Sequence, residues 1–201
     1  MLPILEHIAV ISAACFGVLL ARSKQMDIVG VCSVTFIVAF GGGTLRDVLL
    51  DRHPLFWVAH EHYAWTVLGL AIVGANVPRL PQGAANWLHF PDALGMGLFS
   101  VVGAGLAVEE GVSLSLASLF GVITGTFGGV MGDVVCNEVP SLFRPTTPLY
   151  ASCSLFGISA FLALTHFQVA DTVAQVVGVT IIVVLRMVAL RKGWTLPMPK
   201  S

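Results

Sequence analysis

The sequence predicts an all-α membrane protein with seven transmembrane helices, arranged as an inverted 3+3 repeat plus a seventh helix. Three observations favour this fold. Of the 201 residues, 56% are hydrophobic and 10% are charged, whereas soluble domains carry about 25% charged residues. Apolar segments of about 20 residues, enough to cross a bilayer, follow one another along the chain. A glycine-rich motif in the second segment returns 86 residues later in the fifth.

The apolar segments define the expected spans in chain order. Their boundaries are 4–21, 28–50, 63–79, 92–108, 112–136, 149–166 and 170–190. The N-terminus lacks the basic region of a signal peptide, so the first segment is expected to be a span. The connections are short and rich in Pro, Gly and charge, and none is long enough to separate domains.

The same segments set the expected domain organisation. We expect one transmembrane domain over residues 1–201, with repeat 1 at 4–79, repeat 2 at 92–166 and an extra helix at 170–190. That helix lies outside the repeat, and we expect it to cap the bundle or to supply an oligomer contact.

The basic residues predict how the chain is oriented. Lysine and arginine accumulate on the cytoplasmic side of membrane proteins. One side of the predicted bundle carries Arg22, Lys24, Arg79, Arg144, Arg191, Lys192 and Lys200. On the other side only Arg52 is clearly outside a span. We therefore expect the N-terminus outside and the C-terminus in the cytoplasm.

The first and second spans align with the fourth and fifth without a gap at an offset of 86 residues, and one added residue after the proline extends the match. The matched positions pair Glu6 with Asp92, Gly42-Gly43 with Gly128-Gly129, Asp47 with Asp133, and Pro54 with Pro140. Each half holds three spans, an odd number, so the second half enters the membrane from the opposite side. Such halves are related by a pseudo-two-fold axis in the membrane plane, and substrate sites lie at their interface.

The repeated glycines predict broken helices. Each glycine inside a helix costs about 1 kcal/mol relative to alanine, and the motif Gly41-Gly42-Gly43-Thr44-Leu45-Arg46-Asp47 has three in succession. Thr44 and Asp47 then show the Thr-x-x-Asp spacing of a helix start. The motif Gly128-Gly129-Val130-Met131-Gly132-Asp133 predicts a second break. Unpaired backbone groups at this depth survive only in a water-filled cavity or buried in protein, and they suit ion or zwitterion binding.

Other interpretations of these residues remain open. The Gly-x-x-x-Gly spacing at 121, 125 and 129 also suits close helix packing. Arg46 is a candidate for a gating role and, equally, for a structural ion pair with Asp47 or Asp133. An alternative for Asp47 is a helix N-terminal acid stabilised by the dipole. Arg186, near the end of the last span, is expected to snorkel toward the cytoplasm.

Several functions are not indicated. The net charge of -1 and the absence of a Lys/Arg block argue against nucleic acid and against a soluble acidic partner. No Ser/His/Asp, Cys/His or P-loop arrangement occurs in the sequence, so an enzyme is not expected. His60-Glu61-His62 lacks the i, i+4 spacing of a helical metal site, and no metal or cofactor is expected.

The motifs resemble a known family. They are Gly41-Gly-Gly-Thr-Leu-Arg-Asp47, Pro54-Leu-Phe-Trp57, Asp92-Ala-Leu-Gly95 and Gly125-Thr-Phe-Gly-Gly-Val-Met-Gly-Asp133. They resemble the prokaryotic branch of the trimeric intracellular cation (TRIC) channels, whose bacterial members are also labelled glycine-transporter-like. The family's second motif has Arg before its Asp, where this chain has Gly132.

The resemblance implies a homotrimer in the bacterial inner membrane, in which each protomer holds its own potassium-permeable pore between its second and fifth helices. Potassium or sodium is then the permeant ion. Bound lipid is a further candidate ligand, although no basic cluster matches the one that animal members use. The residues expected to form the pore or gate are Gly41, Gly42, Gly43, Thr44, Arg46, Asp47, Thr126, Gly128, Gly129 and Asp133.

Three functions therefore compete. A non-transporting membrane scaffold is the weakest, because it leaves the duplicated glycine motifs and Arg46-Asp47 unexplained. A monovalent cation channel fits carbonyl-rich breaks accompanied by two acids. An alternating-access carrier of glycine or another small zwitterion fits an inverted repeat with half-helix N-termini equally well. The resemblance favours the channel.

Overall fold

A computed structural model describes residues 2–78 and 88–197. Arg79, which ends the predicted 63–79 span, and Lys200 lie outside these residues. The described chain is helical, and each of the seven predicted spans contains a helix. The helices are α1 (Leu2–Ser23), α2 (Ile28–Leu49), α3 (Phe56–Ala59), α4 (His62–Asn76), α6 (His89–Glu109), α7 (Leu114–Val135), α8 (Ala151–His166) and α9 (Asp171–Lys192).

Five of these helices are long and apolar enough to cross a membrane. They are α1, α2, α6, α7 and α9. The helices in the predicted third and sixth spans are shorter, because α4 has 15 residues and α8 has 16. The four-residue helix α3 follows Pro54 and was not predicted from the sequence.

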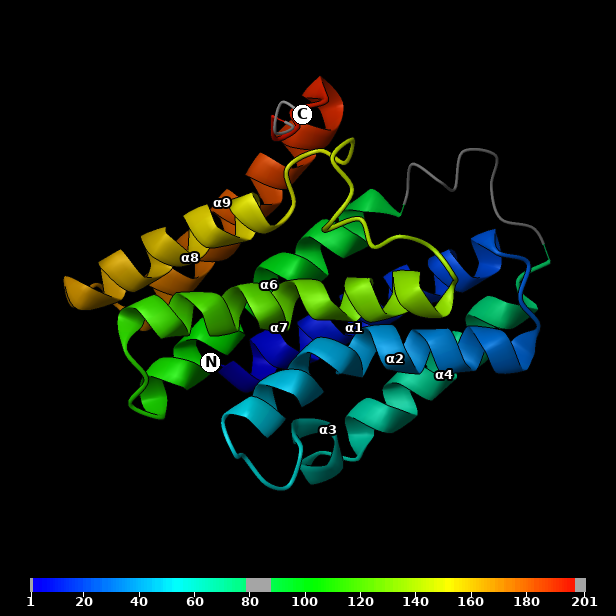
Figure 1. Cartoon of the computed structure of the whole chain (residues 1–201). Helices are drawn as coiled ribbons and strands as arrows, with labels where there is room; N and C mark the ends of the chain where they lie inside the picture. The colour runs from blue at the N-terminus through cyan, green and yellow to red at the C-terminus, as the bar shows by residue number, and fades with distance from the viewer. Residues whose placement is uncertain (1, 79–87, 198–201) are drawn as a thin grey trace.

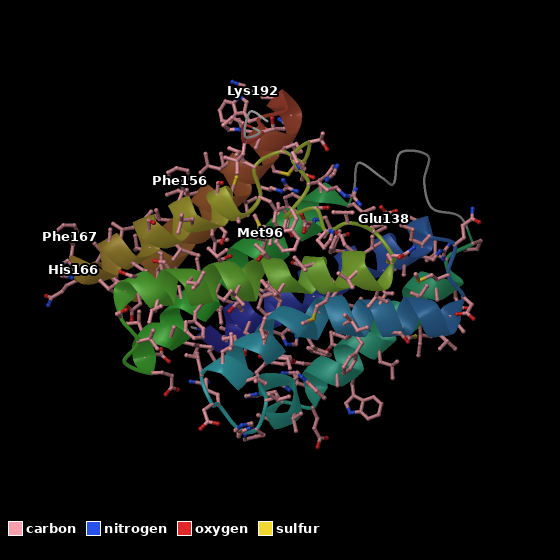
Figure 2. The ribbon with its side chains drawn as sticks, viewed as in Figure 1. Met96, Glu138, Phe156, His166, Phe167 and Lys192 are labelled. Carbon is pink, nitrogen blue, oxygen red and sulfur yellow. The ribbon has the colours of Figure 1, made fainter. Side chains whose placement is uncertain are left out.

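The helices form a bundle with α6 and α7 in its middle (Figure 1). α7 packs against α2, and α6 packs against α1 and α9. α4 lies against α1 and α2 on one side, whereas α8 and α9 lie side by side on the other. In Figure 2, Glu138 lies near one end of the bundle and His166 and Phe167 lie near the opposite end.

The offset of 86 residues found in the sequence reappears in the backbone. α2 and α7 begin 86 residues apart and also end 86 residues apart. The turn after α1 has a left-handed residue at Gln25, and the turn after α6 has one at Gly111. The turns after α2 and α7 have left-handed residues at Asp51 and Asn137, again 86 residues apart.

The glycine motifs do not break their helices, so this expectation from the sequence was wrong. α2 is continuous through Gly41–Gly43, and α7 is continuous through Gly128–Gly129. The glycines serve close approach instead. A Cβ atom on Gly42 would collide with the carbonyl oxygen of Thr124, and one on Gly128 would collide with the carbonyl oxygen of Val38. The packing gained at this crossing offsets the low helix propensity of glycine.

Candidate functional site

The crossing of α2 and α7 is the centre of the candidate site. Val38 lies opposite Gly128, and Thr124 lies opposite Gly42, so the two helices pass each other in opposite directions. Each carbonyl accepts a bond within its own helix and keeps a second lone pair, which faces the neighbouring helix. The glycines thus bring two main-chain oxygens to the interface between the repeats.

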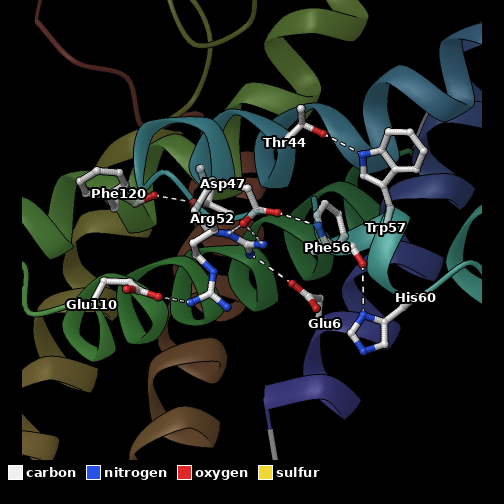
Figure 3. A network of polar contacts seen from close by, with 11 residues as sticks. Glu6, Thr44, Asp47, Arg52, Phe56, Trp57, His60, Glu110 and Phe120 are labelled. Carbon is white, nitrogen blue, oxygen red and sulfur yellow. Dashed lines mark hydrogen bonds and ion pairs between the residues drawn. The ribbon is translucent and has the colours of Figure 1, made fainter. Parts of the chain in front are cut away.

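A buried charge cluster lies on one side of this crossing (Figure 3). Only 1% of Arg46 is exposed. Its Nη2 atom lies 2.7 Å from Oδ1 of Asp47, and its Nη1 atom lies 3.1 Å from Oε1 of Glu6. The backbone N–H of Phe56 donates to Oδ2 of Asp47 at 2.8 Å, and the Arg46 guanidinium lies 5.1 Å from the centroid of the Phe56 ring. We call Glu6, Arg46 and Asp47 the first cluster.

The first cluster decides between two alternatives from the sequence. Arg46 pairs with Asp47 and with Glu6, and not with Asp133. Asp133 instead accepts a hydrogen bond of 2.7 Å from the backbone N–H of Ser141. Glu6 was not among the predicted site residues. The repeat alignment contained a signal for it, because Glu6 is aligned with another acid, Asp92.

A second buried charge cluster lies on the other side of the crossing. The Tyr150 hydroxyl donates to Oδ1 of Asp92 at 2.8 Å, and Nη2 of Arg186 lies 3.5 Å from Oδ2 of Asp92. Nη1 of Arg186 donates to the carbonyls of Pro148 and Leu149 at 2.8 and 3.0 Å. We call Asp92, Tyr150 and Arg186 the second cluster.

The second cluster corrects the interpretation of Arg186. The sequence placed this residue near the cytoplasmic end of the last span and predicted a snorkelling side chain. The structure buries it, with 3% of its surface exposed, and packs its guanidinium 4.5 Å from the centroid of the Tyr150 ring. Sequence reasoning missed this role because Asp92 and Arg186 are 94 residues apart and only the packing of α9 on α6 brings them together.

Each cluster lines a cavity. The cavity at the first cluster has a volume of about 200 Å³ and is lined by Glu6, Arg46 and Asp47 among others. The cavity at the second cluster has a volume of about 370 Å³ and is lined by Asp92 and Arg186. It also reaches Asp133 and Gly129 of the predicted site. We call them the first and second cavities.

A small space lies at the helix crossing itself. Its volume is about 20 Å³, and its walls include Gly42, Thr124 and Gly128. It shares Asp92 and Tyr150 with the second cavity. On the side of the first cavity, the rings of Phe56 and Phe99 pack at a centroid distance of 6.3 Å. This volume is near that of a single water molecule, so the crossing is tightly packed.

The remaining predicted residues lie around the crossing in different roles. The Thr44 hydroxyl accepts a hydrogen bond of 3.1 Å from Nε1 of Trp57. The Thr126 hydroxyl donates to the carbonyl of Val122 in its own helix at 2.7 Å. Gly41 and Gly43 face Met131 and Phe56, respectively. Gly41 therefore faces α7, Gly43 and Thr44 face α3, and Thr126 bonds within α7, whereas the charged groups lie at the cavities.

Comparison with known proteins identifies the family. A family model described as glycine transporter matches residues 3–78 and 89–166. The chain belongs to this family. The two matched blocks cover nearly the same residues as the two repeats predicted from the sequence, and the match agrees with the prokaryotic TRIC resemblance of the motifs.

Relatives from several bacteria cover most of the chain. The inner membrane protein YadS of Escherichia coli strain K12 is 34% identical over 185 residues, which are 91% of this chain and 87% of that protein. A membrane protein of Vibrio cholerae is 35% identical over 91% of this chain and 75% of its own length. These names support a multi-pass protein of the bacterial inner membrane.

Solved structures of family members have the same fold. The trimeric intracellular cation channel orthologue from Rhodobacter sphaeroides matches with a TM-score of 0.90 and 33% identity, over 96% of this chain and 98% of that one. A second structure, described as showing the basis for conductance through TRIC cation channels, matches with a TM-score of 0.87 and 30% identity over 99% of this chain and 97% of its own. These neighbours are channels and not enzymes.

Proposed function

We propose that this protein is a potassium-permeable monovalent cation channel, with a pore inside each protomer of a homotrimer. The observation that carries the proposal is the match to the Rhodobacter sphaeroides TRIC channel over 96% of the chain. The two charged cavities on either side of the α2–α7 crossing add a physical reason. Water-filled cavities lined by acids concentrate cations at both ends of a short constriction.

The proposed topology has seven spans, with the two repeats inserted in opposite directions. The opposite directions of α2 and α7 at their crossing support this arrangement. α4 and α8 rise only about 23 Å, since an α-helix rises about 1.5 Å per residue, and the hydrocarbon core is about 30 Å thick. Local thinning of the bilayer or contacts between protomers accommodate such short helices. The N-terminus lies outside and the C-terminus in the cytoplasm.

The proposed route joins the first cavity, the α2–α7 crossing and the second cavity. In the described conformation the crossing is closed by backbone contact at Gly42 and Gly128 and by the packing of Phe56 on Phe99. A small separation of α2 from α7 would leave the carbonyl oxygens of Val38 and Thr124 facing the gap. Carbonyl oxygens replace part of the hydration shell of a potassium ion. The glycines of the two motifs are therefore gate residues in this proposal.

Two buried arginines lie beside the proposed ion route. The electrostatic potential along the route therefore differs from that of a ring made of acidic residues alone. Each guanidinium is paired with a carboxylate, at Glu6 and Asp47 in the first cluster and at Asp92 in the second. Asp133 has no arginine partner among the described ion pairs and faces the second cavity. We expect cation over anion preference with weak discrimination between potassium and sodium. No cofactor takes part, and lipid is a candidate bound molecule.

A planar-bilayer recording of the purified protein under asymmetric potassium and sodium tests this proposal. We expect ohmic single-channel currents whose reversal potential indicates cation permeation. A preparation that is folded but conducts no cation at any voltage would contradict it. Asp133→Asn should lower the conductance at low salt, because this carboxylate faces the second cavity. The matched control is Asp171→Asn, at the exposed start of α9, which should leave the conductance unchanged.

A second function is favoured by the description of the family model, which is glycine transporter. The second cavity is lined by three basic side chains and three carboxylates, which suits the opposite charges of a small zwitterion; they are Lys24, Arg144, Arg186, Asp92, Asp133 and Glu138. This alternative predicts saturable glycine uptake into proteoliposomes, with counterflow from preloaded vesicles and no matching conductance. Counterflow without channel currents would replace the first proposal with this one.

A further inference from the structure

The two charge clusters are not built in the same way by the two repeats. At the offset of 86 residues, Glu6 is equivalent to Asp92, but Arg46 is equivalent to Gly132. The second repeat therefore has the acid of the cluster and lacks its arginine. A side chain at position 132 would also meet resistance, because a Cβ atom there would lie 2.6 Å from Cγ2 of Val38 and 3.0 Å from Cδ2 of Leu20.

The missing arginine is supplied by α9, which lies outside the repeat. Arg186 pairs with Asp92 as Arg46 pairs with Glu6, and each guanidinium packs on an aromatic ring. Its Nη1 atom is held by the two carbonyls that precede α8. Its Nε atom is buried and has no hydrogen-bond partner within residues 2–78 and 88–197. The side chain is thus anchored at one end while its charge lies at the wall of the second cavity.

We propose that Arg186 is the counter-charge of Asp92 in the second cavity and that it takes the place of the arginine that α7 lacks at Gly132. This inference rests on the proposed channel function. Arg186 neutralises Asp92, and Lys24 and Arg144 pair with Glu138, the third acid of this cavity. Asp133 is then the acid that attracts cations into the cavity. The helix α9, which lies outside the repeat, then takes part in permeation in addition to any role as a cap or oligomer contact.

The electrostatic origin of this role gives it a specific signature. The Debye length is about 30 Å at 0.01 M salt and about 3 Å at 1 M, so a fixed charge in a cavity acts on permeant ions mainly at low salt. Removing the positive charge should raise the local cation concentration. A residue with a structural role alone would change stability or yield and would leave no salt-dependent change in conductance.

The test compares single-channel conductance of four variants with the native protein in symmetric potassium chloride. Arg186→Met should raise the conductance about twofold or more near 0.02 M salt and have little effect near 1 M. Arg186→Lys keeps the charge and should remain close to the native protein. Asp92→Asn leaves the arginine uncompensated and should lower the conductance at low salt. Arg186→Met combined with Asp92→Asn removes one charge of each sign and should restore native conductance.

The matched control is Arg191→Met, which removes a positive charge from an exposed position on the same helix. We expect native conductance at both salt concentrations. If the native protein conducts and Arg186→Met matches it at low salt, the inference is overturned while the channel function stands. If Arg186→Met does not fold, unchanged conductance in Asp92→Asn overturns the inference in the same way. A native protein that does not conduct would instead contradict the proposed function itself.

Discussion

Gly42 and Gly128 are equivalent residues of the two repeats, and each receives the main chain of the other repeat. The carbonyl of Thr124 lies against Gly42, and the carbonyl of Val38 lies against Gly128. Since Val38 and Thr124 are also 86 residues apart, the two contacts are reciprocal. A reciprocal contact of this kind is what a local two-fold relation between two helices requires. The contact between α2 and α7 is thus symmetric at the offset of 86 residues.

The ion pairs at the helix ends repeat this relation with the charges exchanged. Lys24 pairs with Glu138, and Arg52 pairs with Glu110. Lys24 is equivalent to Glu110, and Arg52 is equivalent to Glu138. The two pairs therefore occupy equivalent positions, and in both of them the first repeat supplies the basic residue and the second repeat supplies the acid. Equivalent positions of the two repeats thus make equivalent contacts even where their residues carry opposite charges.

Substituting the two central glycines should destabilise the protein. Gly42→Ala and Gly128→Ala each push a methyl group into a backbone carbonyl, and overpacking of this kind costs about 1–3 kcal/mol. Gly41→Ala should cost less, because its new methyl group would meet the flexible end of Met131. Thermal unfolding of the detergent-solubilised protein measures the effect. Gly69→Ala is the control, since nothing lies within 4 Å of its Cβ position, and a lower Tm there would contradict this explanation.

Removing Arg46 should be among the most damaging single changes. Arg46→Met leaves Glu6 and Asp47 buried without their cation, and breaking a buried ion pair costs about 3–5 kcal/mol. Adding Glu6→Gln and Asp47→Asn to Arg46→Met should recover part of the loss in Tm. Arg52→Met, which breaks the exposed pair with Glu110, should cost at most about 1 kcal/mol. Equal losses for the Arg46 and Arg52 variants would refute the buried-charge explanation.

The hydrogen bond between Trp57 and Thr44 should contribute to the stability of the folded protein. Trp57→Phe removes the indole donor that bonds the Thr44 hydroxyl and should lower stability by about 1 kcal/mol. Thr44→Val should have a similar effect, and the double variant should lose little more than either single one. Trp65→Phe, at an exposed tryptophan on α4, provides the control. If the losses of stability in the two single variants add up in the double variant, Thr44 and Trp57 contribute independently and their hydrogen bond does not explain the losses.

Glu138 should make stability depend on pH. Hydrogen bonds from Lys24 and Arg144 lower the pKa of the Glu138 carboxyl, which lies outside the membrane-spanning segments. A carboxyl whose pKa is lowered by folding contributes stability above its ordinary titration range, and that stability is lost as the pH falls through the lowered pKa. Tm measured from neutral to acidic pH should fall less in Glu138→Gln than in the native protein. An identical acid dependence in the two proteins would rule out this contribution.

The sequence predicted the helices well because their signals are local. Apolar length and the polar connections placed a helix in each expected span, and the boundaries 28–50 and 112–136 lie within two residues of the observed α2 and α7. The offset of 86 residues was also visible in the chain. The glycine motifs were misinterpreted because helix propensity describes the cost of a glycine in an isolated helix. It takes no account of a neighbouring backbone that needs the space of the missing side chain.

The sequence by itself determined that this chain is a membrane protein, that its helices form two related halves, and that glycines and charges meet where those halves meet. Only the tertiary structure decided that Arg46 pairs with Glu6, that Arg186 pairs with Asp92, and that α2 and α7 remain continuous. The physical reason is that composition and periodicity act along the chain, whereas the choice of a partner for a buried charge depends on which helices pack together. In low-dielectric surroundings a buried charge must be paired, and packing determines which partner is within reach.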